Sequence, residues 1–164
     1  MKKLLIITFL FAFVIVSYSQ NQTIFILVRH AEKAIDGTNN PPLSEAGLQR
    51  ANDLAALLAN QKIDALYSTP FIRTEATLIP IGRDKGMEVK NYDPYAGASW
   101  LSEALKKHKG GTIVISGHSN TIPGLANALL GEETFQQFDD NDYSNLIIIV
   151  TNEVGKGKLV RLKF

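Results

Sequence analysis

The sequence contains no cysteine and only three histidines among its 164 residues. Without cysteine the chain can form no disulfide, no thiolate metal site and no cysteine nucleophile, so a cysteine-based phosphatase is excluded. Three histidines without clustered carboxylates also argue against a catalytic metal site. We therefore expect neither a metal nor another cofactor.

Basic clusters are also missing. Lys and Arg number 17 against 16 Asp and Glu, for a formal net charge of +1. The chain has no run of basic residues and no stripe of basic and aromatic residues, so nucleic acid is not an expected partner. A Walker-type phosphate loop is absent as well. Hydrophobic residues make up 45% and charged residues 20%, which is typical of a single globular domain.

The one long apolar stretch, residues 4–16, is shorter than the ~20 residues that a membrane-spanning helix needs. Lys2 and Lys3 precede it, and Ser17-Tyr18-Ser19 follows with small residues at the spacing that a signal peptidase reads. The pattern predicts a cleaved secretory signal over 1–19 and a single domain over 20–164. The mature protein would be periplasmic or secreted, without stable membrane insertion; an uncleaved anchor is the alternative.

The remaining sequence alternates apolar, β-rich runs with amphipathic helical segments. Helical spacing follows Ser44, which has the character of an N-cap. Pro80 is expected to kink the second helix or end it early. Strands are predicted at 23–28, 63–67, 87–90, 112–116, 146–151 and 158–164, and further helices at 72–83, 100–108 and 123–130. This order favours an α/β fold with a mostly parallel sheet and helices on both faces. The short connection between the last two strands makes that pair antiparallel.

Polar residues gather where three predicted strands end. Arg29 and His30 follow the first strand, and His118 follows the fourth. Ser68 and Thr69 stand at the end of the second strand, with Arg73 one helical turn further on. In such sheets ligands bind beyond the carboxyl ends of the strands. Arginine matches phosphate oxygens in bidentate fashion, and histidine can act as a covalent nucleophile. The pattern therefore indicates a phosphoryl site. The third histidine, His108, is predicted to be a solvated helix end.

As a set, Arg29-His30-Ala31-Glu32, Arg73-Thr74 and Gly117-His118-Ser119 resemble the motifs of the histidine phosphatase superfamily, in its phosphoglycerate-mutase-like branch. The resemblance covers almost the whole chain after the predicted signal. It implies a three-layer α/β/α sandwich, no metal and a small phosphorylated substrate. It also implies that His30 is the phosphorylated nucleophile and that Arg29, Arg73 and His118 form the phosphate pocket. Ala31 stands where the family usually has glycine.

The proton donor does not follow from these motifs. The segment after Arg73 is short and lacks the Glu-containing insertion usual in the family. Asp93, in the loop after the third predicted strand, is the best-placed acid. Glu32 is its rival, or else the partner of an arginine. A small capping insertion implies an open pocket, which favours a phosphatase over a mutase.

Other classes of protein fit less well. Gly117 to Thr121 nearly matches the G-x-S-x-G elbow of esterases, but it ends in threonine and no histidine follows His118. The acidic stretch 139–142 lacks the glycine and terminal glutamate of a calcium loop, so we expect a solvated loop. A protein that binds a phosphorylated ligand without turnover remains the non-enzymatic alternative. No particular oligomeric state is predicted.

Overall fold

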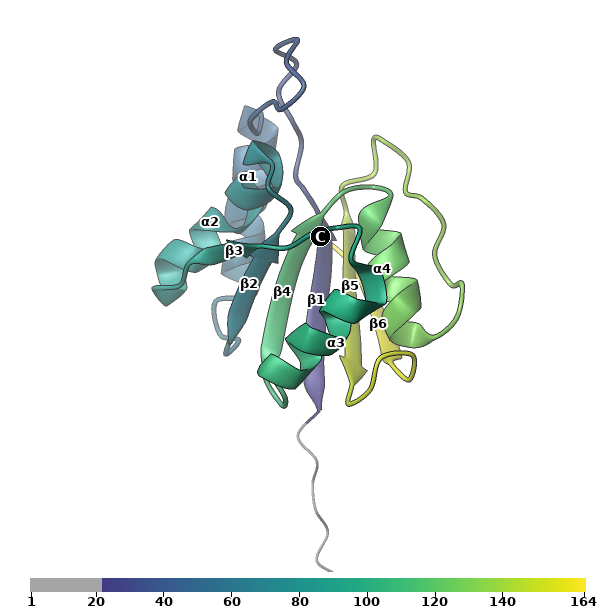
Figure 1. Ribbon diagram of the computed structural model, residues 1–164. Helices are drawn as coiled ribbons and strands as arrows, with labels where there is room; N and C mark the ends of the chain where they lie inside the picture. Colours follow the sequence, from purple (N-terminus) through teal and green to yellow (C-terminus); the bar gives the residue numbers. More distant parts are fainter. Residues whose placement is uncertain (1–21) are drawn as a thin grey trace, which may run out of the picture.

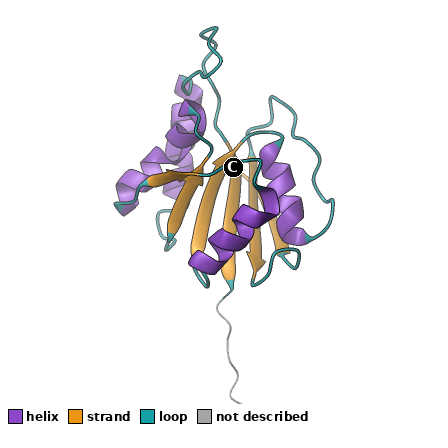
Figure 2. Cartoon of the chain, viewed as in Figure 1, coloured by secondary structure: helices purple, strands orange, loops and turns teal. Residues whose placement is uncertain are grey.

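The computed structural model describes residues 22–164, so the predicted signal, residues 1–19, lies outside the described part. A six-stranded sheet forms the central layer, with the order β3-β2-β4-β1-β5-β6 (Figures 1 and 2). The strands are β1 (Thr23–Arg29), β2 (Ala65–Ser68), β3 (Val89–Asn91), β4 (Thr112–Gly117), β5 (Asn145–Thr151) and β6 (Lys158–Lys163).

Two pairs of helices form the outer layers. The helices are α1 (Glu45–Leu57), α2 (Ile72–Lys85), α3 (Gly97–Lys107) and α4 (Thr121–Leu130). Leu54 of α1 and Leu78 of α2 belong to one buried cluster, whereas Leu101 of α3 and Leu125 of α4 belong to another. The sheet thus has a separate core on each face, as a three-layer α/β/α sandwich requires.

Strand β1 shows why this sequence forms a central strand. Phe25 and Leu27 pack into the cluster beneath α3 and α4, whereas Ile26 and Val28 pack into the cluster beneath α1 and α2. Successive side chains of a strand point to opposite faces, so a strand buried on both faces needs a continuous apolar run. Each such side chain contributes about 1.5–3 kcal/mol when fully buried.

The strand directions confirm the predicted fold class. β1 and β2 both run parallel to β4, and β3 runs parallel to β2. β5 pairs antiparallel with both β1 and β6. The register sets Arg29 opposite Gly117, and Ser68 opposite Ser116. The carboxyl ends of β1, β2 and β4 therefore meet at one edge of the sheet.

Local signals fix several helix ends. The Ser44 side chain accepts a hydrogen bond from the Gly47 N–H at 3.1 Å, as expected of an N-cap. Gly47 also lies so close to the Glu32 carbonyl that a side chain there would collide with it. Gly131 ends α4 with a φ of 80°, a left-handed conformation that favours glycine.

Helix α2 departs from the prediction at Pro80. The helix neither ends early nor stops at residue 83 but continues to Lys85, with Pro80 buried inside it. Proline removes one backbone hydrogen bond from a helix, a loss that packing against the core can offset. Ile81, the next residue, is buried in the cluster beneath α1 and α2. No helix in residues 22–164 has both the length and the apolar character to span a membrane.

Candidate active site

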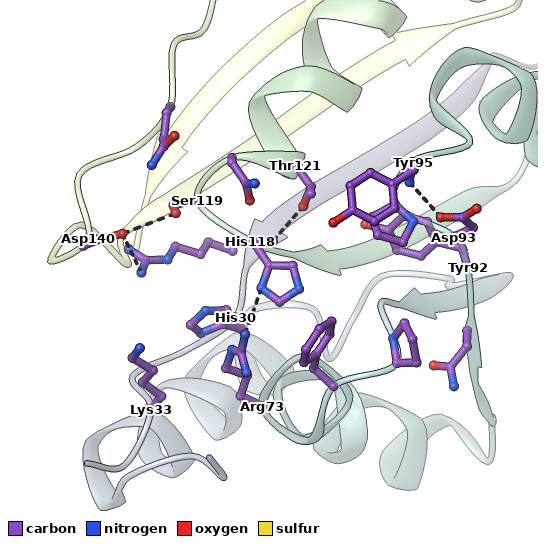
Figure 3. A pocket seen from close by; sticks show the side chains of 17 residues that line it. His30, Lys33, Arg73, Tyr92, Asp93, Tyr95, His118, Ser119, Thr121 and Asp140 are labelled. Atoms are coloured by element: carbon purple, nitrogen blue, oxygen red, sulfur yellow. Dashed lines mark hydrogen bonds and ion pairs between the residues drawn. The ribbon is translucent and has the colours of Figure 1, made fainter. Parts of the chain in front are cut away.

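The three strand ends open into one pocket of about 840 Å³ (Figure 3). Arg29, His30, Arg73 and His118 all line it. We call these four residues the floor of the pocket. Of the remaining lining residues, Asn91 ends β3 and Thr121 begins α4, and the others lie on loops after β1, β2, β3 and β4 and on the long loop before β5. The structure thus brings together the residues that the sequence pattern indicates, while their catalytic roles stay predictions.

His30 is held in one tautomer. Its backbone N–H extends the β1–β4 ladder by donating to the Gly117 carbonyl at 2.8 Å. Its ring Nδ1 lies 2.8 Å from the Ala31 carbonyl, which can only accept, so Nδ1 carries the proton. Burial is the main factor that lowers the pKa of His30 to about 3, and Arg29 and Arg73 add to it. The imidazole is therefore neutral, with its lone pair on Nε2.

Arg29 is almost fully buried, and its side chain is held by residues of the loop that precedes β5. Its Nη1 donates to the carbonyl oxygens of Asp139, at 2.9 Å, and Asp142, at 3.3 Å. Its Cζ lies 4.2 Å from the centre of the Tyr143 ring, within cation–π distance. Nε is buried without a hydrogen-bond partner among residues 22–164. The guanidinium is thus fixed in place with donor capacity to spare.

Arg73 has still more free donor capacity. Its Nη2 lies 3.5 Å from His118 Nδ1, while Nε and Nη1 are buried without partners among the described residues. Burial, with a contribution from Arg29, lowers the pKa of Arg73. A buried donor without a partner costs ~1–3 kcal/mol, and more if it is charged. Since Arg73 lines the pocket, its guanidinium is placed to pair with an anion bound there.

A chain of hydroxyl groups sets the tautomer of His118. Thr74 Oγ1 lies 2.8 Å from each of the Thr69 and Phe71 carbonyls, so its hydrogen points to them. Thr69 Oγ1 then donates to Thr74 Oγ1 at 2.9 Å and can only accept from His118 Nε2, also at 2.9 Å. Burial, followed by Arg73 and Arg29, lowers the pKa of His118 to about 4. The neutral ring therefore carries its proton on Nε2 and turns the Nδ1 lone pair toward Arg73.

Thr77 connects the first and second strand ends. Its Oγ1 accepts from the Ala31 N–H at 3.0 Å and donates to the Arg73 carbonyl at 2.8 Å. The residue after His30 is thus tied to the backbone of the second arginine. The sequence pattern alone did not indicate a role for Thr69 or Thr77. The available signal was their position, Thr69 directly after a strand and Thr77 one helical turn after Arg73.

The two candidate acids are placed very differently. Asp93 lines the pocket on an exposed turn, where its Oδ1 accepts from the Tyr95 N–H at 2.8 Å. Glu32 does not line the pocket, because both of its oxygens accept from Arg50, at 2.7–2.9 Å. These hydrogen bonds also lower the pKa of Glu32. The structure thus gives Glu32 the alternative role, that of an arginine's partner.

The acidic loop 139–142 does more than the sequence indicated. The side chains of Asp139 and Asp140 are exposed, as expected of a solvated loop. The backbone of the loop, however, holds Arg29, and Asp140 Oδ1 lies 3.8 Å from Arg29 Nη2. Asp140 also lines the pocket as a second carboxylate that sequence reasoning missed. Asp142 stabilises the end of this loop by accepting hydrogen bonds from Ser144. These hydrogen bonds lower the pKa of Asp142 to about 2.

His108 is not a solvated helix end. It is partly buried, and its Nε2 lies 3.0 Å from the Tyr67 hydroxyl. Its ring packs edge-on against the Tyr67 ring, with 5.8 Å between the ring centres. The prediction was wrong because α3 folds back over the sheet, which the local charge of 106–109 does not reveal. No group of three or more metal-ligating side chains occurs among residues 22–164.

Comparison with known proteins shows which family the chain resembles. Residues 25–94 match the model of the histidine phosphatase superfamily (branch 1), a segment that includes Arg29, His30, Arg73 and Asp93. Phosphoserine phosphatase 1 of Hydrogenobacter thermophilus is 39% identical over 74 residues, which make up 42% of this chain and 35% of that protein. The chain thus matches only about a third of that relative's length.

Solved structures extend the likeness over most of the chain. The protein histidine phosphatase SixA, solved with tungstate, has a TM-score of 0.70 at 18% identity, over 85% of this chain and 96% of that one. A mycobacterial glucosyl-3-phosphoglycerate phosphatase has a TM-score of 0.71 at 13% identity, over 84% and 97%. A phosphoserine phosphatase of Entamoeba histolytica has a TM-score of 0.69 at 18% identity, over 87% and 97%. Together, the family match over residues 25–94 and the shared fold confirm the resemblance to the histidine phosphatase superfamily.

Proposed function

We propose that this protein is an exported phosphomonoesterase that works through a phosphohistidine intermediate on His30. The observation that carries the proposal is that a nucleophilic histidine and two phosphate-binding arginines line the same pocket. A neutral imidazole with its lone pair on Nε2 shares one pocket with two arginines, and three of their nitrogen atoms are buried without a hydrogen-bond partner among residues 22–164. Free guanidinium donors match phosphoryl oxygens, and a neutral imidazole is the nucleophilic form.

In the first step, His30 Nε2 attacks the phosphorus of a phosphomonoester. The P–N bond forms as the P–O ester bond breaks, and the departing alkoxide takes a proton from Asp93. Arg29 and Arg73 stabilise the charge on the phosphoryl oxygens, an effect usually worth several kcal/mol when donors are held in place beforehand. The Nδ1–H bond to the Ala31 carbonyl fixes the ring and stabilises the positive charge that develops on it.

In the second step, water attacks the phosphorus of the phosphohistidine. The Asp93 carboxylate accepts a proton from this water, the P–N bond breaks and its electron pair returns to Nε2. Inorganic phosphate leaves, and His30 is again neutral. Asp93 suits this double role because only one of its oxygens is engaged, by the Tyr95 N–H, and because it is exposed to solvent.

The relatives support a small phosphorylated substrate. The Entamoeba histolytica phosphoserine phosphatase was solved with 3-phosphoglyceric acid, and a mutant of it with phosphoserine. The relative with matching sequence is also named as a phosphoserine phosphatase. These names favour hydrolysis over ligand binding alone for a protein with this floor.

Export is the part of the proposal that depends on the sequence alone. Its support is the pair Lys2-Lys3, the apolar stretch 4–16 and the small residues at 17–19. Intact-mass measurement of the protein purified from its native host tests it. We expect a species that begins near Gln20 in a soluble fraction outside the cytoplasm. A full-length species held in membranes would contradict export without affecting the chemistry.

The activity is tested with the mature protein and a panel of phosphomonoesters that includes p-nitrophenyl phosphate. We expect release of inorganic phosphate that EDTA does not reduce. His30→Ala is the matched inactive variant. A protein that binds phosphorylated ligands without turnover would release no phosphate from any ester in the panel, and that result would reject the enzymatic function.

A further inference from the structure

The pocket has two arms of opposite character, which meet at the floor. The charged arm contains Lys33 and Asp140 and lies beside Arg29. The apolar arm is formed by two prolines and three aromatic residues, namely Pro70, Phe71, Tyr92, Pro94 and Tyr95. Figure 3 shows Lys33 and Asp140 on one side of His30 and His118, and Tyr92 and Tyr95 on the other.

This division follows from the order of the strands. β1 and β5 are neighbours, so the loops at their ends supply the charged arm. β2 and β3 are neighbours on the other side of β4, and the segments that follow them, 70–71 and 92–95, supply the apolar arm. A substrate whose phosphoryl group lies on the floor must extend its leaving group along one of these arms or into solvent.

Two aromatic residues of the apolar arm are packed against other side chains. Tyr92 stacks on Trp100 with 4.3 Å between ring centres and an angle of 23° between ring planes. Phe71 meets the His118 ring edge-on at 4.9 Å and lies under the Arg73 guanidinium at 4.7 Å. Proline rings add apolar surface that loses little entropy on binding. Tyr95 differs, because it is 91% exposed and only its backbone is anchored, by Asp93.

The charges of the apolar arm also restrict what it can bind. The cations among the described lining residues are Arg29, Lys33 and Arg73, and of these only Arg73 touches the apolar arm, through the Phe71 ring. Asp93 is the one acidic group beside it among the described residues. Beyond Arg73, a leaving group with a second phosphate or a carboxylate would find no counter-charge among the described lining residues of this arm. An uncharged, flat and apolar group would instead exchange water for contact with Tyr95 and the proline rings.

We propose that the apolar arm is a leaving-group subsite for phosphomonoesters of aromatic alcohols, with Tyr95 closing over the ring. This proposal builds on the phosphatase function and names its substrate class. The arm is continuous with the floor, and its Asp93 is the group that would protonate the departing oxygen. Because ring stacking adds to simple burial, a flat ring is preferred over a puckered ring of the same size.

The test compares ligands with matched chemistry. Benzyl and cyclohexylmethyl phosphate have alkyl-type leaving groups of similar size, so they differ mainly in the flatness of the ring. Their phosphonate analogues, which cannot be hydrolysed, report binding alone by calorimetry. We expect the benzyl compound to be favoured in kcat/KM and in affinity by between about threefold and tenfold. Tyr95→Ala should remove this preference, and Tyr95→Phe should retain it.

Ile79→Ala is the matched control, since Ile79 is an exposed apolar residue of α2 outside this pocket. It should leave the preference unchanged. Equal values for the two rings, or a preference that survives in Tyr95→Ala, would overturn the subsite. If neither ester is hydrolysed but benzylphosphonate binding still depends on Tyr95, the subsite stands and the phosphatase function fails. If both esters are hydrolysed without a preference, the phosphatase function stands and the subsite fails.

Discussion

The floor of the pocket and its rim are built in different ways. The floor residues lie at the ends of β1 and β4 and in the first turn of α2, and they are held by backbone carbonyls and by Thr69. The rim residues Asp93, Tyr95 and Asp140 lie on loops, and all three are exposed. The floor is therefore suited to the chemistry common to phosphomonoesters, and the rim to the choice among them.

This difference also has an energetic side. Two neutral histidines beside two arginines, with His30 and Arg29 buried and His118 and Arg73 partly buried, are costly to assemble, and the sheet edge holds them in place. Exposed loop residues can change without disturbing the core. Substitutions in the floor should thus affect every substrate, whereas substitutions in the rim should affect some substrates more than others. The following experiments test that division, from the largest expected effect to the smallest.

His30→Ala should abolish turnover of every ester in a panel, since it removes the only nucleophile in the mechanism. We expect activity to fall to the background of the assay. Circular dichroism and thermal unfolding should show that the variant is folded. An equal loss of activity for all esters supports the assignment of His30 to the floor. Substantial turnover of any one ester would mean that another group attacks phosphorus.

Asp93→Asn should separate substrates by their leaving groups. General acid catalysis typically contributes 10²–10⁴-fold, and an alkyl alcohol needs the proton far more than p-nitrophenolate does. We expect kcat/KM to fall within about that range for alkyl phosphates and far less for p-nitrophenyl phosphate.

The matched control for this experiment is Glu32→Gln. Glu32 is bound to Arg50 and does not line the pocket, so its substitution should show no such dependence on the leaving group. If Glu32→Gln shows this dependence on the leaving group and Asp93→Asn does not, then Asp93 is not the general acid. In that case the rim does not supply the proton.

Arg73→Lys keeps the positive charge but loses the forked donor geometry. Removal of a single preorganised donor typically costs about 10²–10³-fold in kcat. We expect a loss near the lower end of that range, about 10²-fold, and of similar size for alkyl and nitrophenyl esters. A rate close to that of the unchanged protein would place Arg73 outside the transition state, despite its position in the floor.

Thr69→Val tests whether a residue behind the floor acts through His118. Valine keeps the shape of the side chain but leaves the Nε2–H of His118 without its acceptor. An unsatisfied buried donor costs ~1–3 kcal/mol, so we expect about a tenfold fall in kcat/KM and weaker binding of orthovanadate. Thr69→Ser, which restores the hydroxyl, should recover both. Loss of thermal stability alone, with unchanged vanadate binding, would make the role of Thr69 merely structural.

The smallest effect concerns stability and pH. The pKa values of His30 and His118 are lowered to about 3 and 4 from the ordinary 6.5. Between pH 6.5 and 4, the unfolded chain binds protons at these histidines that the folded chain does not bind. The free energy of unfolding should therefore be independent of these groups above pH 6.5 and fall as the pH drops below it.

Urea unfolding between pH 7.5 and 5 measures this effect apart from most carboxylates, which titrate lower, and together with a contribution of the same sign from His108, whose pKa burial also lowers. His118→Asn should show a smaller decrease than the unchanged protein over that range. A stability that rises on acidification to pH 5 would mean that the floor histidines are charged in the folded protein.

The floor could be predicted from the sequence because its signals are local. An apolar run that ends in Arg29-His30 places both residues at the carboxyl end of a buried strand, and the same reasoning applies to His118. The parallel topology then brings these strand ends together. The sheet, its antiparallel end and the cap at Ser44 follow from similar short-range patterns.

The supports of the floor could not be predicted in this way. The carbonyls that hold Arg29 come from residues 110 and 113 positions further along the chain, in a loop whose composition indicates only solvation. The partner of His108, Tyr67, lies on β2, whereas His108 follows α3. Pro80 is tolerated because tertiary packing outweighs helix propensity. In each case the deciding contact is distant in sequence.

The central claim is that the phosphoryl group of the substrate is transferred to His30 before it is transferred to water. Rapid mixing of the mature protein with p-nitrophenyl phosphate, followed by quenching in alkali and mass spectrometry of the peptides, tests it most directly. The expected result is one phosphoryl group on His30, stable in alkali and lost in acid, as a phosphoramidate is, and formed fast enough to account for turnover. Turnover without this adduct, or with the same adduct on another residue in His30→Ala, would contradict the account.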